Sequence, residues 1–93
     1  MINYFSGSLK ENEMIKPTIG RVVLYRPHGI NGPTLPAIIC HVWNDQVINI
    51  AGFTSNGAPL AATSVRLDQG QEIDEWLPRC EWMPSQIAQD ESY

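Results

Sequence analysis

Short apolar runs separated by glycine, proline and asparagine dominate the middle of the chain. Four such runs span residues 21–26, 37–43, 46–51 and 61–67. Each is rich in the β-branched and aromatic residues that strands prefer. A fifth short strand is expected within residues 75–82. The pattern therefore predicts five short antiparallel strands.

Turn signals lie between these runs. Asn44-Asp45 separates the second and third runs, and Asn56-Gly57 precedes the fourth; asparagine, aspartate and glycine tolerate the left-handed dihedrals of tight hairpins. Residues 27–36 hold three prolines and two glycines, which predicts a long loop because proline cannot donate to a strand ladder. Pro84 suits the start of a short helical turn over residues 84–89.

Five short strands in one small chain favour an all-β fold, a partly open five-stranded barrel of the Src-homology-3 type. An oligonucleotide-binding barrel is the nearest rival, but it needs longer strands and a helix where this chain has only residues 52–59. We expect an N-terminal extension over residues 1–16, the barrel over 17–84 and a tail over 85–93. Both faces of residues 38–43 are substantially apolar, which favours a homo-oligomer.

Composition narrows the class of protein. The chain has 93 residues, 43% of them hydrophobic and 17% charged, as in a single folded domain. No apolar run approaches the roughly 18 residues of a membrane-spanning helix, so we expect a cytoplasmic protein without a membrane partner. The formal net charge of −4 argues against coating duplex nucleic acid.

The sequence gives little support for catalysis or metal binding. The two cysteines, Cys40 and Cys80, form no C-x-x-C motif, and His28 and His41 form no H-x-x-H motif. Nucleophile-elbow, zinc-protease and phosphate-loop motifs are also absent. We therefore expect a protein with no catalytic residues, metal or cofactor.

Arginine and aromatic residues are the strongest candidates for a binding site. Four of the six basic residues are arginines, whose planar fork matches phosphate or carboxylate. Arg26 and Arg66 are the preferred phosphate contacts, although surface arginines more often pair with carboxylates. Aromatic rings can stack on a nucleobase, although tryptophans are more often anchors of a core or an interface. The predicted ligand-binding residues are Tyr25, Arg26, His28, Trp43, Asn49, Thr63, Ser64 and Arg66.

Four segments carry a resemblance to small proteins encoded in tailed-phage genomes. They are Ile19-Gly20-Arg21-Val22-Val23-Leu24-Tyr25, Pro36-Ala37-Ile38-Ile39-Cys40-His41-Val42-Trp43, Val47-Ile48-Asn49-Ile50 and Cys80-Glu81-Trp82-Met83-Pro84. The resemblance covers roughly residues 17–84. It implies a protein of the infected bacterial cell. Phage chains of this size that are not virion parts often look like counter-defence proteins, among them the anti-CBASS and anti-Thoeris sponges that hold signalling nucleotides without cleaving them.

Three functional hypotheses remain open. The first is a phage counter-defence protein that binds and sequesters a cyclic oligonucleotide or related immune signal of the host. The second is a protein-interaction module that binds and inhibits a host protein, which suits the acidic net charge. The third is a structural component of the virion.

Overall fold

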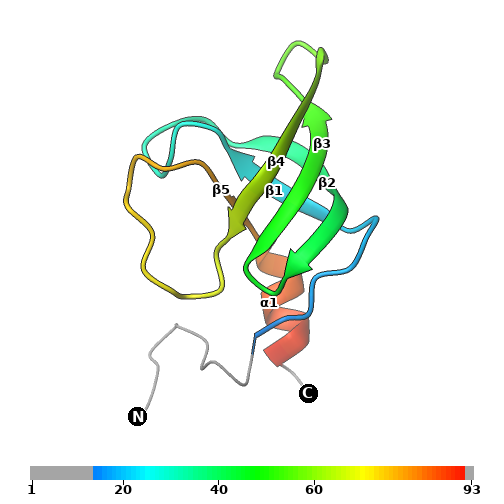
Figure 1. Ribbon diagram of the computed structural model, residues 1–93, viewed down its shortest axis with the longest axis vertical. Coiled ribbons are helices and arrows are strands. Elements are labelled where there is room, and N and C mark those ends of the chain that lie inside the picture. The colour runs from blue at the N-terminus through cyan, green and yellow to red at the C-terminus, as the bar shows by residue number, and fades with distance from the viewer. Residues whose placement is uncertain (1–13, 92–93) are drawn as a thin grey trace.

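A computed structural model describes residues 14–91, with side chains up to residue 87. It contains five strands and one helix: β1 (Val22–Arg26), β2 (Leu35–Asn44), β3 (Val47–Phe53), β4 (Pro59–Leu67), β5 (Arg79–Glu81) and α1 (Pro84–Glu91). The strands form a closed barrel in the order β1-β2-β3-β4-β5 (Figure 1). The predicted all-β class and the small five-stranded barrel are confirmed.

One strand pairing differs from the prediction. β1 pairs antiparallel with both β2 and β5, and β2–β3 and β3–β4 are also antiparallel. β4 and β5 are parallel, with Arg66 opposite Arg79 and Leu67 opposite Cys80. Residues 68–78 form a long loop that carries the chain back to the start of a strand running in the same direction (Figure 1). This short parallel pair closes the barrel that the sequence predicted to be partly open.

Alternating residues of every strand fill the core. Strand side chains point to opposite faces in turn, and in this barrel one set points inward. The buried hydrophobic residues are Ile15, Val23, Tyr25, Ala37, Ile39, Ile48, Ile50, Val65, Leu67, Cys80 and Trp82. The predicted apolar runs therefore supply nearly all of this core.

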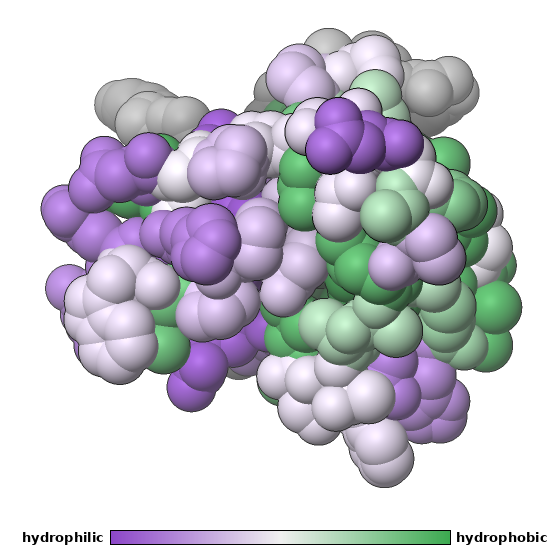
Figure 2. Space-filling view, turned by 90° about the horizontal axis from the view of Figure 1, so that it is seen from above, coloured by the Kyte–Doolittle hydropathy of each residue, from purple (hydrophilic) through white to green (hydrophobic). Residues whose placement is uncertain are grey.

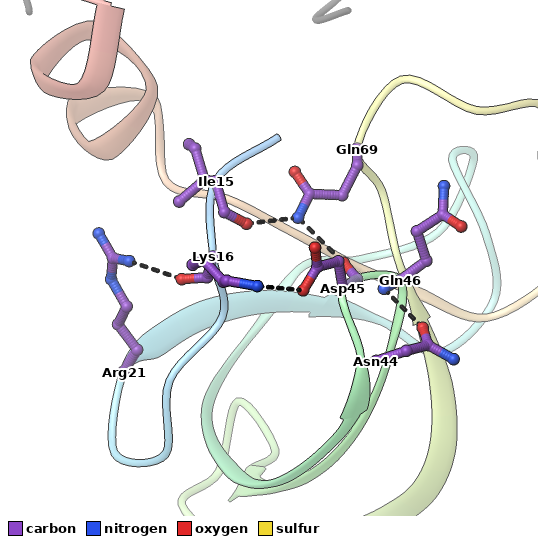
Figure 3. A network of polar contacts seen from close by, with 7 residues as sticks. All are labelled: Ile15, Lys16, Arg21, Asn44, Asp45, Gln46 and Gln69. Carbon is purple, nitrogen blue, oxygen red and sulfur yellow. Dashed lines mark hydrogen bonds and ion pairs between the residues drawn. The ribbon is translucent and has the colours of Figure 1, made fainter. Parts of the chain in front are cut away.

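The hydrophobic core includes a residue of the segment that precedes residue 17. Ile15 is only 3% exposed and belongs to the core, and its carbonyl accepts a hydrogen bond of 2.6 Å from Gln69 Nε2. Figure 3 shows Gln69 between Ile15 and Asp45, whose carbonyl lies 3.0 Å from the same nitrogen. Residues 1–13 of the predicted extension and residues 92–93 of the tail lie outside the described residues.

Two loops lie together at the side of the barrel that is on the left in Figure 1. Ile30 N donates to Glu75 O over 2.9 Å, which joins the β1–β2 loop to the β4–β5 loop. Gly29 makes this approach possible because its φ is +80° and a Cβ there would collide with the Glu75 carbonyl oxygen. Within residues 14–91, no helix is long and apolar enough to cross a membrane.

Candidate functional site

Three irregularities of the sheet meet around Asn49 on β3. Register shifts lie between Ile39 and His41 and between Val42 and Asn44 on β2, and a further shift interrupts the β3–β4 ladder between Ile48 and Ile50. A bulge re-aims side chains and often lies next to a functional site. The shifts bring side chains from β2, β3 and β4 together on the outer surface.

Asn49 connects this cluster through one oxygen. Its Oδ1 accepts hydrogen bonds from Trp43 Nε1 at 2.9 Å and from the backbone nitrogen of Ser64 at 2.8 Å. Ser64 has a φ of 54°, a left-handed conformation that is uncommon for residues other than glycine. The Asn49 side chain thus satisfies the backbone at the bulge and fixes the tryptophan.

Trp43 forms an exposed but immobilised aromatic platform. Its side chain is 59% exposed, although a large aromatic surface in water is unfavourable. The His41 ring meets it edge-on, with the ring centroids 4.5 Å apart and the planes at 76°. With Nε1 held by Asn49 and the ring held by His41, the indole is positioned before any ligand arrives.

Three arginines lie opposite one another on neighbouring strands of the barrel. Register places Asn44 opposite Val47, Val47 opposite Arg66, Arg66 opposite Arg79, and Arg79 opposite Arg26. Paired residues share one face of a sheet, so three arginines occupy neighbouring strands in one row. We call Arg66, Arg79 and Arg26 the arginine row.

The three arginines differ in what they contact. Arg79 is 5% exposed, and its guanidinium donates to the carbonyls of Leu77 and Asp74. Arg26 Nε lies 3.0 Å from Glu81 Oε2, and Nη1 donates to Gly32 O over 3.3 Å. Arg66 is exposed, and among the side chains of residues 14–87 it has neither an ion pair nor a hydrogen bond. Arg66 is the member of the row that is available to a ligand.

The predicted site residues fall into two groups. Trp43, Asn49, Thr63, Ser64 and Arg66 lie together on the outer surface of β2, β3 and β4. Arg26 is joined to this group only through the arginine row, and its guanidinium holds the β1–β2 loop. His28 is exposed in that loop. Tyr25 is buried, and its pKa is raised mainly by burial and further by the neighbouring Cys80.

Two residues of this region were missed by the sequence analysis. The sequence showed only that His41 belongs to no metal-binding motif, yet its ring supports Trp43. Arg79 was not among the predicted phosphate contacts, yet it is buried in the middle of the arginine row. A bulge on β2 places His41 beside Trp43, and the parallel pairing of β4 and β5 places Arg79 in the row. Neither a bulge nor a parallel pairing leaves a local signal in the sequence.

No protein-family model, curated protein or solved structure matches the chain significantly. Among the described residues, no cluster of three or more histidine, cysteine, aspartate or glutamate side chains could hold a metal ion.

Proposed function

We propose that the protein is a non-enzymatic phage counter-defence protein that binds and sequesters a cyclic-nucleotide immune signal of the bacterial host. Trp43 stacks on a base, Arg66 contacts a phosphate, and Thr63 and Ser64 offer hydroxyls to the ligand. The observation that carries the proposal is that Asn49 joins the exposed Trp43 to Ser64 of β4, two residues before the exposed Arg66 with which the arginine row begins.

The charge of the arginine row supports an anionic ligand. Arg79 is a buried cation that has carbonyl partners but no carboxylate within the part of the chain whose side chains are described. A buried charge is costly unless an opposite charge compensates it. A phosphate bound at the neighbouring Arg66 would supply that compensation.

The aromatic platform supports a ligand with a base. Stacking on an aromatic side chain contributes about 1–3 kcal/mol per base in single-stranded nucleic-acid sites. Because Asn49 and His41 already hold the indole of Trp43, ligand binding would cost little side-chain entropy. An aromatic ring beside a phosphate-binding fork suits a nucleotide better than a simple anion.

A thermal-shift screen against cyclic di-AMP, cyclic di-GMP, cyclic tri-AMP and ADP-ribose tests the proposal. A ligand at a hundred times its dissociation constant stabilises a protein by about 2.7 kcal/mol, which raises the Tm of a small domain by roughly 10 °C or more. Arg66→Ala should weaken binding about tenfold or more, because a hydrogen bond to a charged group contributes about 1.5–3 kcal/mol. Trp43→Ala should weaken it similarly.

Matched variants separate a site effect from a general one. Lys16→Ala removes an exposed positive charge away from the arginine row, where Lys16 pairs only with Asp45 at 3.7 Å. Trp76→Ala removes another exposed tryptophan, in the β4–β5 loop. Both controls should bind like the wild type. No shift with any of the nucleotides, or equal losses in the controls, would contradict the proposal.

A second candidate function is a protein-interaction module that binds and inhibits a host protein. Trp76 is 70% exposed, and its loop holds four acidic residues: Asp68, Glu72, Asp74 and Glu75. An exposed tryptophan in a loop with several acidic residues suits a basic protein partner. Retention of a stoichiometric host protein, abolished by Trp76→Ala but not by Trp43→Ala, would favour this function over nucleotide sequestration.

A further inference from the structure

An uncharged apolar row crosses the outer surface of four strands. Val22 on β1 is opposite Ile38 on β2, Ile38 is opposite Ala51 on β3, and Ala51 is opposite Ala61 on β4. All four residues are exposed, and Val22 and Ile38 each expose 43% of their surface. We call these four residues the apolar row. It is the outward counterpart of the core positions that alternate with it.

The apolar surface continues beyond this row. Phe53 lies two residues after Ala51 on the same strand, is 49% exposed, and faces the exposed Pro59 of β4. The side chains of Ala51 and Ala61 are short, so the centre of this surface does not protrude. A surface with small side chains at its centre can approach a second sheet closely, and sheets that pack face to face are about 10 Å apart.

Charge is concentrated on the other side of the molecule. The apolar row, Phe53 and Pro59 contain no ionisable side chain. The acidic residues of the β4–β5 loop lie on the side that is on the left in Figure 1. In Figure 2, hydrophilic residues gather on that left side, and hydrophobic residues gather on the right, over the strands. Four of the six acidic side chains among residues 14–87 therefore lie in a loop away from the apolar row.

We propose that a second copy of this chain packs on the apolar row, in a two-fold symmetric dimer. An uncharged apolar surface is best covered by another one, and the chain itself presents such a surface. A two-fold axis brings the row onto itself, as in most homodimers. It also turns the acidic loops of both copies outward, which minimises the repulsion between two negatively charged chains.

The size of the surface predicts a reversible dimer. A standard interface buries about 800 Å² per partner, and smaller ones form weak complexes. A row four strands wide spans roughly 15 Å across the strands, which places the interface at the small end of this range. The dimer should therefore be reversible and dissociate on dilution.

Sedimentation equilibrium of the full chain, without added nucleotide, tests the dimer. At about 100 µM the wild type should have twice the chain mass of 10.4 kDa, whereas Ile38→Lys should have the mass of one chain. Ile30→Lys is a matched control, because Ile30 is 42% exposed but lies in the β1–β2 loop. It should remain dimeric.

Ala51→Glu provides a second disruption of the same surface if Ile38→Lys fails to fold, and circular dichroism checks the fold of each variant. A wild-type chain of monomeric mass, or a folded Ile38→Lys or Ala51→Glu variant with the mass of the wild type, would overturn the proposal. The result does not depend on nucleotide binding, because Arg66 and Trp43 remain unchanged in these variants.

Discussion

Gln69 shows how one polar side chain can organise a small core. Its amide nitrogen donates to the carbonyls of Ile15 and Asp45, and its Oε1 accepts from Trp82 Nε1 over 3.1 Å. Gln69 is buried. If its amide were removed, the two carbonyls and the indole nitrogen would lose a hydrogen-bond partner at a place where water cannot replace it. Gln69 thereby connects three segments that are far apart in the sequence.

Gln69→Leu should lower the free energy of unfolding by about 2–4 kcal/mol, because unsatisfied buried groups cost about 1–3 kcal/mol each. Urea denaturation of the wild type and the variant measures this loss. Gln46→Leu is the control, because the hydrogen bonds of Gln46 among the described residues are made by its backbone nitrogen and carbonyl and not by its side chain. Equal stability of the Gln69→Leu and Gln46→Leu variants would refute the organising role.

The buried thiol of Cys80 should make the folded protein less stable at alkaline pH. Burial, with a smaller effect of Glu81, raises the pKa of its thiol from 9.0 to about 12. Above pH 9 the Cys80 thiol therefore keeps its proton in the folded state and loses it in the unfolded state. The contribution of Cys80 to the free energy of unfolding is fully present below pH 9 and is lost as the pH rises toward 12. The loss is on the order of 4 kcal/mol across this range.

Chemical denaturation at a series of pH values from 8 to 11 measures this decline. In Cys80→Ala the decline should be much shallower, and what remains should reflect Tyr25, whose raised pKa acts in the same direction. Cys40→Ala is the control, because Cys40 is exposed. An equally steep decline in Cys80→Ala would show that another group causes the pH dependence.

At the scale of elements, the strands could be predicted and their irregularities could not. The apolar runs predicted four of the five strands to within a few residues, because β-branched residues and turn residues are local signals. The bulges at Cys40, Trp43 and Ser64 depend on which strands pair, and pairing is not local. The sequence therefore indicated Trp43, Asn49 and Ser64 as separate candidates without showing that they touch.

The β4 bulge provides a direct test of backbone geometry. Ser64 has a φ of 54°, so Ser64→Gly should change the free energy of unfolding by less than about 1 kcal/mol. Ser64→Val should reduce it by about 1–3 kcal/mol, because a β-branched side chain is strained at this φ. Thermal unfolding of the two variants gives the comparison, and a Ser64→Val variant as stable as Ser64→Gly would rule out the left-handed conformation.

At the scale of the whole molecule, the exposed aromatic and apolar side chains lie in three places. Trp43 and Arg66 are exposed on β2 and β4, the apolar row crosses β1 to β4, and Trp76 lies in the acidic β4–β5 loop, which also contacts the buried Arg79. The composition predicted an acidic protein but not these positions, because net charge carries no information on position. An exposed arginine without a carboxylate partner among residues 14–87 lets a negatively charged chain present a local site for an anion.

Isothermal titration of the wild type and Arg66→Ala with the nucleotide that gives the largest thermal shift is the decisive test of nucleotide sequestration. We expect saturable binding by the wild type, affinity at least about tenfold weaker in Arg66→Ala, and recovery of chemically unchanged nucleotide after the protein is denatured. Equal affinity in the two proteins, or recovery of a cleaved nucleotide, would contradict it.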